Sequence, residues 1–400
     1  MILIFLKATR LASLRAFDVD LDSFTSSVLF SYIRSTFPPP KAFSPTYVPF
    51  LNIPRSGVRL RAEVAAVCVH AGIRTESLLT LDDLPNDLIT SQRVRWLLVD
   101  HNKLTGKLEE VPQSHVLGAI DHHVEEDWVS RATEPEPRII EKAGSCTSLV
   151  TRYCRSAWDE ISSASLGIGA AHGQGEAAIN DSAFTQVWDA KAAKLGLASI
   201  LIDTTNLTAS DKVEQADRDA VEYLETRIMM SRSDAGAWDR KAFYEEINRA
   251  KKDLDRLTLP EILIKDYKQW TENGLKLGVS SVVKDLSYLS RKAEKKHFDA
   301  HLDDFMKDKE LDVFAAMSIS KTKEGKRRQI LLQSGPRAGD YIEKFEKRVE
   351  GELKLSDLEV DGFQASTGTE SGPVKRKAWW QSDISKSRKQ VAPLLREVLH

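Results

Sequence analysis

Short apolar runs alternate with longer helical stretches along the first half of the chain. Such continuous apolar strands between helices are typical of a parallel sheet with helices on both faces. The pattern therefore predicts an α/β domain with a doubly wound, mainly parallel sheet. Three of the apolar runs each end in an aspartate: Val94–Val99 before Asp100, Val116–Ile120 before Asp121, and Ser199–Ile202 before Asp203.

The last third of the chain has a different pattern. Charged helical stretches come first, and strand candidates follow, with a polar turn between the last two strands. This order predicts a smaller α+β domain with a mixed sheet. The strand candidates are 279–283, 313–319 and 329–333. The stretch 229–238 is rich in Ser, Asp, Gly and Arg, and we place the domain junction there, with domains at 1–228 and 239–400.

Composition supports an ordinary globular protein rather than a disordered or fibrous chain. Of 400 residues, 42% are hydrophobic and 29% are charged. No apolar run approaches the roughly 18–20 residues that span a bilayer, and we expect neither a membrane partner nor a secretory signal. The three cysteines have no C-x-x-C spacing, which suits a reducing compartment and predicts a cytoplasmic location.

Charge is distributed unevenly between the two halves. The net charge is −2, so no global basic signature of nucleic-acid binding is present and no nucleic-acid partner is expected. The last 160 residues carry 32 Lys and Arg against 27 Asp and Glu, whereas the first 240 carry 25 against 32. The front half is thus richer in potential cation ligands and the back half in potential anion binders.

The aspartates at the strand ends point to metal chemistry. Ligands bind beyond the carboxyl ends of parallel strands, and carboxylates gathered there repel one another unless a cation lies among them. His101 and the pair His122-His123 lie at the same edge, and Asp20-Leu21-Asp22 begins a predicted helix. Oxygen ligands with an imidazole favour manganese, magnesium or cobalt over structural zinc. Taken singly, such an Asp is also a common helix cap, and a His pair is commonly solvated.

Several ordered motifs give the chain a family resemblance. The motifs are Asp20-Leu21-Asp22-Ser23, Leu98-Val99-Asp100-His101-Asn102, Asp121-His122-His123, Gly144-Ser145-Cys146-Thr147-Ser148 and Leu201-Ile202-Asp203-Thr204. With these motifs the chain resembles the DHH phosphoesterases, and most of all the fungal exopolyphosphatase branch, which is related to family II inorganic pyrophosphatase and to prune. The resemblance includes the DHH-associated C-terminal domain.

The resemblance implies two divalent metal ions, with manganese as the first choice. It also implies that His123 faces the phosphate and that His101 orients the bridging carboxylate of Asp100. The implied ligands are Asp20 and Asp100 for one ion, and Asp22, Asp100, His122 and Asp203 for the other.

In the second domain the resemblance implies phosphate-binding cations. Arg388 and Lys389 match the family's Ser-Arg-Lys stretch, and Lys268 resembles its other phosphate-binding lysine, with Lys284 a weaker candidate. The runs Lys326–Arg328 and Lys375–Lys377 bind extended polyphosphate, act as nuclear-import-like signals or are solvated surface, and these alternatives stay open. Gly144-Ser145 opens a predicted helix whose N–H groups could accept a phosphate or a carboxylate, or it is a plain turn.

One feature departs from the family pattern. The family has a His or Asn ligand four residues before the first aspartate, at the end of a first strand, whereas this chain has Ala16. Residues 5–17 are predicted to be helical, so we expect the first strand to be missing or altered. A vacant ligand position can be filled by water, but the loss predicts weaker metal binding.

The predicted function is a metal-dependent phosphoanhydride hydrolase. Its activity would be that of an exopolyphosphatase, releasing terminal orthophosphate from inorganic polyphosphate by an activated water between two metals. His123, Asp100, Arg388 and Lys389 would be the catalytic residues, and Lys268 would assist in substrate binding. The alternatives are an inorganic pyrophosphatase or prune-like nucleotide phosphodiesterase, and a catalytically impaired relative that binds phosphate chains or proteins.

Overall fold

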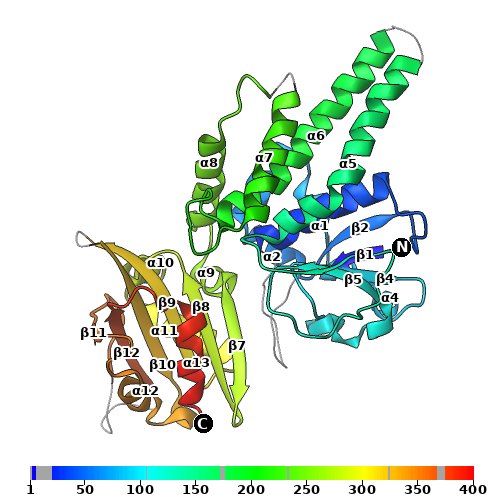
Figure 1. Ribbon diagram of the computed structural model, residues 1–400. Helices are drawn as coiled ribbons and strands as arrows, with labels where there is room; N and C mark the ends of the chain where they lie inside the picture. The colour runs from blue at the N-terminus through cyan, green and yellow to red at the C-terminus, as the bar shows by residue number, and fades with distance from the viewer. Residues whose placement is uncertain are drawn as a thin grey trace. The chain divides into compact units, whose positions relative to one another are not determined.

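The computed structural model describes residues 2–5, 20–104, 106–171, 176–231, 234–322, 325–366 and 374–400. These form two compact units, one with the described residues up to Asp253 and one over Leu254–His400. Each unit contains one six-stranded sheet (Figure 1). The junction predicted at 229–238 lies before helix α8 (Arg240–Lys252), whereas the contacts of α8 place it in the first unit.

The first unit has the predicted α/β architecture. Its strand order is β3-β2-β1-β4-β5-β6, and every neighbouring pair is parallel. This is the order of a doubly wound sheet, so the predicted fold class is confirmed. The strands are β1 (Ile2–Phe5), β2 (Tyr47–Leu51), β3 (Leu79–Thr80), β4 (Arg95–Val99), β5 (Val116–Asp121) and β6 (Arg138–Ile140). The helices are α1 (Leu21–Thr36), α2 (Arg55–Arg59), α3 (Ala62–Ala71), α4 (Asn86–Ile89), α5 (Cys146–Ala171), α6 (Glu176–Asp203), α7 (Gln215–Met230) and α8.

Of the two expectations for the first strand, that it is missing or altered, the first is wrong. Strand β1 lies in the centre of the sheet and pairs in parallel with β2 on one side and β4 on the other. Phe5, which we predicted to be helical, is its last residue. Four apolar residues form too short a run to be assigned by periodicity alone, and two neighbouring strands supply the pairing that decides it. Ala16 lies outside the described residues.

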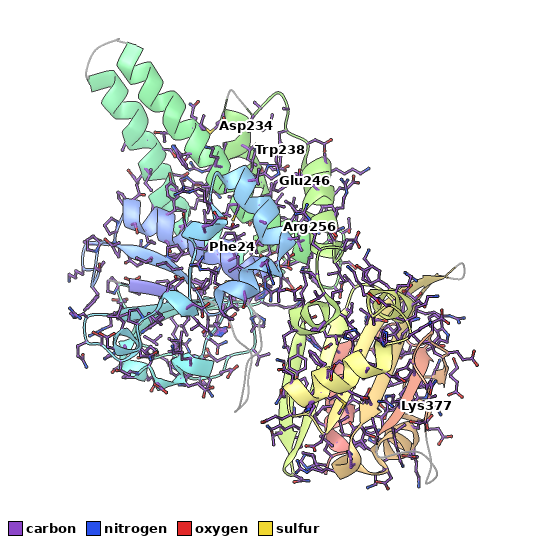
Figure 2. The ribbon with its side chains drawn as sticks, turned by 180° about the vertical axis from the view of Figure 1, so that it is seen from behind. Phe24, Asp234, Trp238, Glu246, Arg256 and Lys377 are labelled. Carbon is purple, nitrogen blue, oxygen red and sulfur yellow. The ribbon has the colours of Figure 1, made fainter. Side chains whose placement is uncertain are left out.

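Alternate residues of β4 enter two different apolar clusters. Leu97 and Val99 pack with the helices of one face, whereas Trp96 and Leu98 pack on the other face under short turns and α4. Phe24 of α1, labelled in Figure 2, is fully buried in the helical cluster. A strand buried on both faces reads as a continuous apolar run, which explains why the sequence pattern identified β4 and β5.

The prediction of a strand at residues 199–202 is also wrong. Residues 199–202 form the end of α6, a helix of 28 residues that packs against α5 and α7. A short run with three apolar residues in four fits a buried helix as well as a strand, and the preceding Ala-rich turns continue through it. Asp203 is therefore the last residue of a helix and not of a strand.

The second unit is the predicted α+β domain with a mixed sheet. The strand order is β11-β12-β10-β9-β8-β7, and β8–β9 is the parallel pair among antiparallel neighbours. Helices α12 and α13 cover one face, and α10 and α11 cover the other (Figures 1 and 2). The elements are α9 (Leu259–Lys265), β7 (Tyr267–Glu272), β8 (Leu275–Val282), α10 (Leu286–Lys292), α11 (Phe298–Asp308), β9 (Val313–Thr322), β10 (Gly325–Ser334), α12 (Tyr341–Val349), β11 (Leu355–Asp357), β12 (Lys375–Gln381) and α13 (Arg388–Glu397).

In the part of the chain that the structure describes, no helix is both long enough and apolar enough to cross a membrane.

Candidate metal and phosphate site

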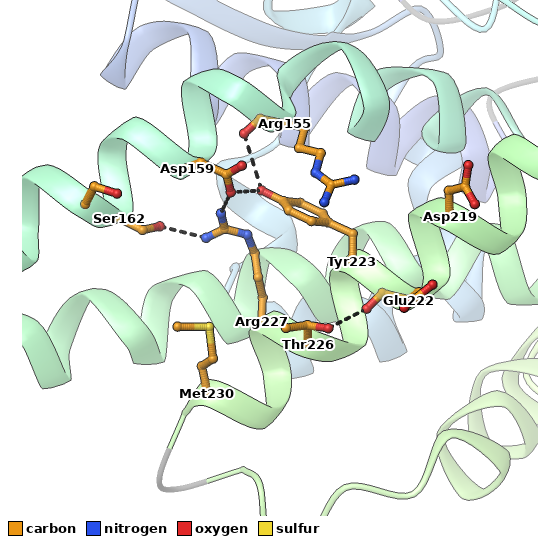
Figure 3. A pocket seen from close by; sticks show the side chains of 10 residues that line it. Arg155, Asp159, Ser162, Asp219, Glu222, Tyr223, Thr226, Arg227 and Met230 are labelled. Atoms are coloured by element: carbon orange, nitrogen blue, oxygen red, sulfur yellow. Dashed lines mark hydrogen bonds and ion pairs between the residues drawn. The ribbon is translucent and has the colours of Figure 1, made fainter.

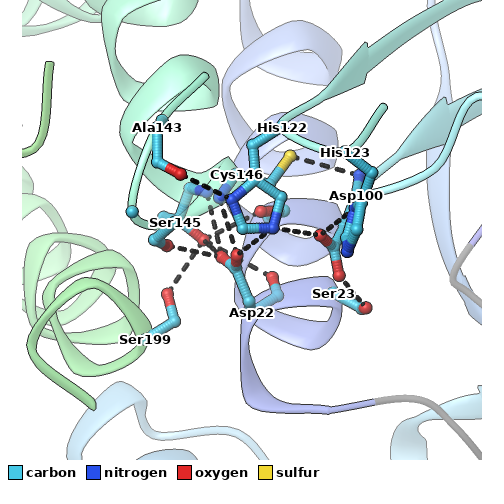
Figure 4. Close-up of polar contacts among 12 residues, drawn as sticks. Asp22, Ser23, Asp100, His122, His123, Ala143, Ser145, Cys146 and Ser199 are labelled. Atoms are coloured by element: carbon cyan, nitrogen blue, oxygen red, sulfur yellow. Dashed lines mark hydrogen bonds and ion pairs between the residues drawn. The ribbon is translucent and has the colours of Figure 1, made fainter. Parts of the chain in front are cut away.

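The sheet order of the first unit places the site. The order reverses between β1 and β4, and in open α/β sheets ligands bind beyond the carboxyl ends of the strands at this point. Asp100 directly follows β4, and Asp121 ends β5. Asp22 joins them from the first turn of α1. Side chains that are far apart in sequence therefore meet at one edge (Figure 4).

Asp100 is held in an uncommon backbone conformation at the centre of the site. Its φ angle is 59°, in the left-handed region that few residues other than glycine adopt. Its N–H donates to the carbonyl of Ile120 at 2.8 Å and lies 3.1 Å from the Sγ of Cys146. The Oγ of Ser23 donates to Oδ2 at 2.5 Å. Ile120 and Cys146 thus fix the backbone of Asp100, and Ser23 fixes its buried carboxylate.

The two histidines of the Asp121-His122-His123 motif converge on the other carboxylate oxygen of Asp100. Oδ1 lies 3.2 Å from Nε2 of His122 and 3.7 Å from Nδ1 of His123. Ligand atoms of these three residues all lie within 4.8 Å of one another, so the group could hold a metal ion. Burial lowers the pKa of His122, but its hydrogen bond to Asp100 and the charges of Asp100 and Asp22 raise it to about 10.

Asp121 orients His123 instead of joining this group. Its Oδ1 accepts hydrogen bonds from the backbone N–H groups of both histidines and lies 2.8 Å from Nδ1 of His123. Its Oδ2 accepts from Nδ2 of Asn102 at 2.6 Å. Burial raises the pKa of Asp121, yet the hydrogen bond and charge of His123 bring it below its usual value. The chain Asn102–Asp121–His123 therefore sets the direction of the His123 ring.

Asp22 occupies the N-terminus of α5. Its Oδ1 accepts from the Oγ of Ser145 and from both N–H and Oγ1 of Thr147, while Oδ2 accepts from the N–H of Cys146 at 2.6 Å. Oδ2 is also the oxygen 3.9 Å from Nε2 of His122. Burial and then the charge of Asp100 raise the pKa of Asp22 to about 6. The helix start predicted at Gly144-Ser145 thus accepts a carboxylate from the chain itself.

A second buried carboxylate, Asp217, fixes the same helix start and was missed by the sequence reasoning. It accepts hydrogen bonds from the N–H groups of Gly144 and Glu214 at 2.8 Å and from the Oγ of Ser148 at 2.6 Å. A Cβ on Gly144 would lie 2.7 Å from Oδ2 of Asp217, so only glycine fits. The sequence signals an acid in the first turn of α7, but not that it reaches α5.

The remaining predicted ligands, Asp20 and Asp203, lie near the three-residue group of Asp100, His122 and His123 without belonging to it. Asp20 is the exposed N-cap of α1 and accepts from the N–H of Ser23 at 3.1 Å. Desolvation raises the pKa of Asp203 well above its usual value, and the charges of Asp22, Asp20 and Asp100 raise it further. The negative charges of the neighbouring aspartates therefore act on Asp203. The metal-binding roles of Asp20 and Asp203 stay predictions. His101 is buried, and its Nδ1 lies 3.0 Å from the carbonyl of Asp100.

The predicted phosphate-binding cations lie in the second unit. Arg388 begins α13, and its Nη1 lies 2.9 Å from the carbonyl and 2.7 Å from Oδ1 of Asp266, which precedes β7. Lys268 lies on β7, two residues after Asp266. Lys389 is exposed. Their roles in binding phosphate stay predictions.

A cavity of about 490 Å³ between α5 and α7 is lined by charged side chains that pair with one another (Figure 3). Its buried arginine, Arg227, pairs with Asp159 at 2.5 Å and with Asp189 at 2.8 Å. The guanidinium also lies over the rings of Trp158 and Tyr223. Because its charge is already balanced, this network stabilises the packing of α5, α6 and α7.

Comparison with known proteins identifies the relatives of the chain. Residues 245–398 match the family model described as the DHHA2 domain. Over 384 residues, the chain is 30% identical to a Schizosaccharomyces pombe protein assigned as an exopolyphosphatase, which covers 94% of this chain and 87% of the relative. It is 25% identical to human exopolyphosphatase PRUNE1, over 95% of this chain and 73% of that protein.

A solved structure shares the fold of the chain. It is a Methanococcus jannaschii protein assigned as a family II inorganic pyrophosphatase, with a TM-score of 0.52 and 21% sequence identity, over 95% of this chain and 96% of that one. Fold, site and relatives together define the class as the phosphoanhydride hydrolases of the DHH superfamily. Within that superfamily, the chain belongs to the exopolyphosphatase-like family that carries a DHHA2 domain.

Proposed function

We propose that the protein is a metal-dependent exopolyphosphatase that releases terminal orthophosphate from inorganic polyphosphate in the cytoplasm. The observation that carries the proposal is the convergence of Asp100, His122 and His123 at the point where the sheet order reverses. The name of the Schizosaccharomyces pombe relative supports polyphosphate as the substrate.

The donor set fits divalent metal ions. Buried carboxylates and an imidazole suit manganese, magnesium or cobalt, with manganese as our first choice. In the proposal, Asp20, Asp22, Asp100, His122 and Asp203 hold two such ions. Bound there, divalent ions polarise phosphoryl oxygens and lower the pKa of water.

The chain's own residues do the rest of the proposed work. Asp121 holds His123, so that its ring is oriented before substrate arrives and can hydrogen-bond a phosphoryl oxygen. Arg388, Lys389 and Lys268 offset the negative charge that develops on the phosphoryl group. In this proposal the first unit binds metal and the second binds substrate.

Orthophosphate release from polyphosphate by the purified protein, with manganese present, tests the proposal. We expect release that stops when the metal is chelated and that Asp100→Asn abolishes. Parallel assays on pyrophosphate and cyclic nucleotides identify the two enzymatic alternatives. Folded, metal-loaded protein without any release would contradict the proposal and favour the impaired relative. In that case Ala16→Asn should restore activity if position 16 is the cause.

A further inference from the structure

Arg328 on β10 is a half-buried arginine without a carboxylate partner among the described residues. Its Nε donates to the carbonyl of Ile384 at 2.9 Å. Three other half-buried arginines of this unit each form an ion pair with a carboxylate. These are Arg376 with Asp303 at 2.5 Å, Arg388 with Asp266 at 2.7 Å, and Arg396 with Glu272 at 2.5 Å.

The electrostatic surroundings of Arg328 agree with this contrast. Its pKa is lowered, and the cause is burial alone, with no opposing carboxylate. The acid of the neighbouring loop, Asp383, is engaged by the N–H and Oγ of Ser385, and the charges next in importance for it are Lys386 and Lys354. A partly desolvated guanidinium without a counter-charge is suited to an anionic ligand, and its planar fork suits phosphate.

Arg328 lies on the same face of the sheet as the loop that leads to Arg388. It shares its face with Ile330, two residues further along β10, which packs in the core under α12 and α13. Its register partner on β12, Gln381, donates hydrogen bonds to the carbonyls of Asp383 and Lys386 and so holds this loop. Arg328 and Arg388 are thus connected through one loop.

The carboxylate that holds Arg388 is separated from Arg328 across the sheet. The guanidinium of Arg388 bonds Asp266, just before β7, whereas Arg328 is on β10, three strands away. At the usual strand spacing this is roughly 14 Å between the backbones of β7 and β10. We therefore expect a long phosphate chain held at Arg388, and not a short one, to extend to Arg328.

We propose that Arg328 is a phosphate subsite that selects long polyphosphate chains, binding a phosphate distant from those held by Lys268 and Arg388. The inference rests on the proposed function for its substrate class. It also selects, among the alternatives that the sequence left open for Lys326–Arg328, phosphate binding at Arg328.

The test compares KM for long-chain polyphosphate with KM for tripolyphosphate. Arg328→Gln should raise KM for the long chain about tenfold or more, because a charge-assisted hydrogen bond is lost. The KM for tripolyphosphate and both kcat values should stay within about twofold. Arg328→Lys, which keeps the charge without the fork, should give an intermediate KM. The control is Arg291→Gln, which removes the same charge from an exposed position at the end of α10.

Each outcome decides the inference. An unchanged KM for the long chain would overturn it. An equal rise for both substrates would also overturn it, since that result means that Arg328 only supports the loop before Arg388. If the wild-type protein hydrolyses neither substrate, the proposed function fails, and metal-free titration with long-chain polyphosphate then tests Arg328 directly. In that titration, equal affinity of the wild type and Arg328→Gln for polyphosphate would overturn the inference. Weaker binding by the variant would support it.

Discussion

The acidic cluster of the first unit (Asp20, Asp22, Asp100 and Asp203) and the predicted phosphate-binding cations of the second unit (Lys268, Arg388 and Lys389) differ in how the protein surrounds their charges. Asp22 and Asp100 are buried, and protein donors from several elements fix their oxygens. Lys389 is exposed, and Arg388 is half-buried with a single carboxylate partner. Buried like charges repel strongly and depend on a cation, whereas exposed charges are screened by salt. Changes in the acidic cluster should therefore have the larger effects.

The largest effect is expected for Asp100→Asn. Asp100 lies between His122 and His123, so losing its charge should remove metal binding and lower activity by more than the ~10–100-fold typical of an outer ligand shell. Manganese titration and orthophosphate release measure this. The matched control is Asp127→Asn, an exposed aspartate in the segment between β5 and β6. Near-normal manganese affinity in Asp100→Asn would contradict the assignment.

The pH dependence of metal binding should follow His122. Its pKa of about 10 in the metal-free protein is raised above the ~6.5 of the unfolded chain. Its contribution to the free energy of unfolding is therefore complete below pH ~6.5 and lost as pH rises through about 10. Because a metal needs the neutral imidazole, manganese affinity should increase up to about tenfold per pH unit in that window.

Calorimetric titration at several pH values between 6.5 and 8.5 measures this slope. His122→Asn should flatten it, while the partly exposed His70, which pairs with Glu246, serves as the control position in His70→Asn. A slope that survives in His122→Asn would assign it to another group.

Asp217→Asn sharpens the comparison by removing a buried charge that touches no proposed ligand atom. Loss of the carboxylate that accepts from α5 and α7 should lower the free energy of unfolding by about 3 kcal/mol. It should also lower activity, because the α5 start that holds Asp22 loosens. Denaturant unfolding measures the first effect. Asp219→Asn, exposed on the same helix, should leave both unchanged.

Among the predicted phosphate-binding cations, Arg388→Gln should raise KM about tenfold, the loss expected for one charge-assisted hydrogen bond. The wild-type KM should also rise with salt, and this slope should be shallower in the variant. The control Arg348→Gln removes an exposed arginine of α12 that pairs with Glu352. Equal salt slopes in the wild type and Arg388→Gln would exclude Arg388 from phosphate binding.

The smallest effect is expected for Asp20→Ser. This change separates the role of Asp20 as helix cap from its proposed role as metal ligand. Serine also caps helices, so the free energy of unfolding should change by less than about 0.5 kcal/mol. If Asp20 is a metal ligand, manganese affinity should still fall, by about three- to tenfold, because water can replace an exposed ligand. Unchanged affinity would leave Asp20 as a cap only.

Local pattern was sufficient for much of the fold. The apolar runs that became β4 and β5 are buried on both faces, which produces a continuous signal. The short runs that became β1 and the end of α6 were assigned wrongly, because four residues carry no reliable period. In each of these cases the neighbouring elements decided the conformation.

The chemistry predicted for the candidate site follows from the sequence, because carboxylates and imidazoles at motif spacing are local properties of the chain. Which partners those groups meet depends on the tertiary structure. Asp217 contacts a helix start 73 residues away in sequence, His123 is oriented by Asp121 and Asn102, and Arg328 is half-buried without a carboxylate partner among the described residues. Such relations depend on packing between distant segments, and no periodicity within one segment encodes them.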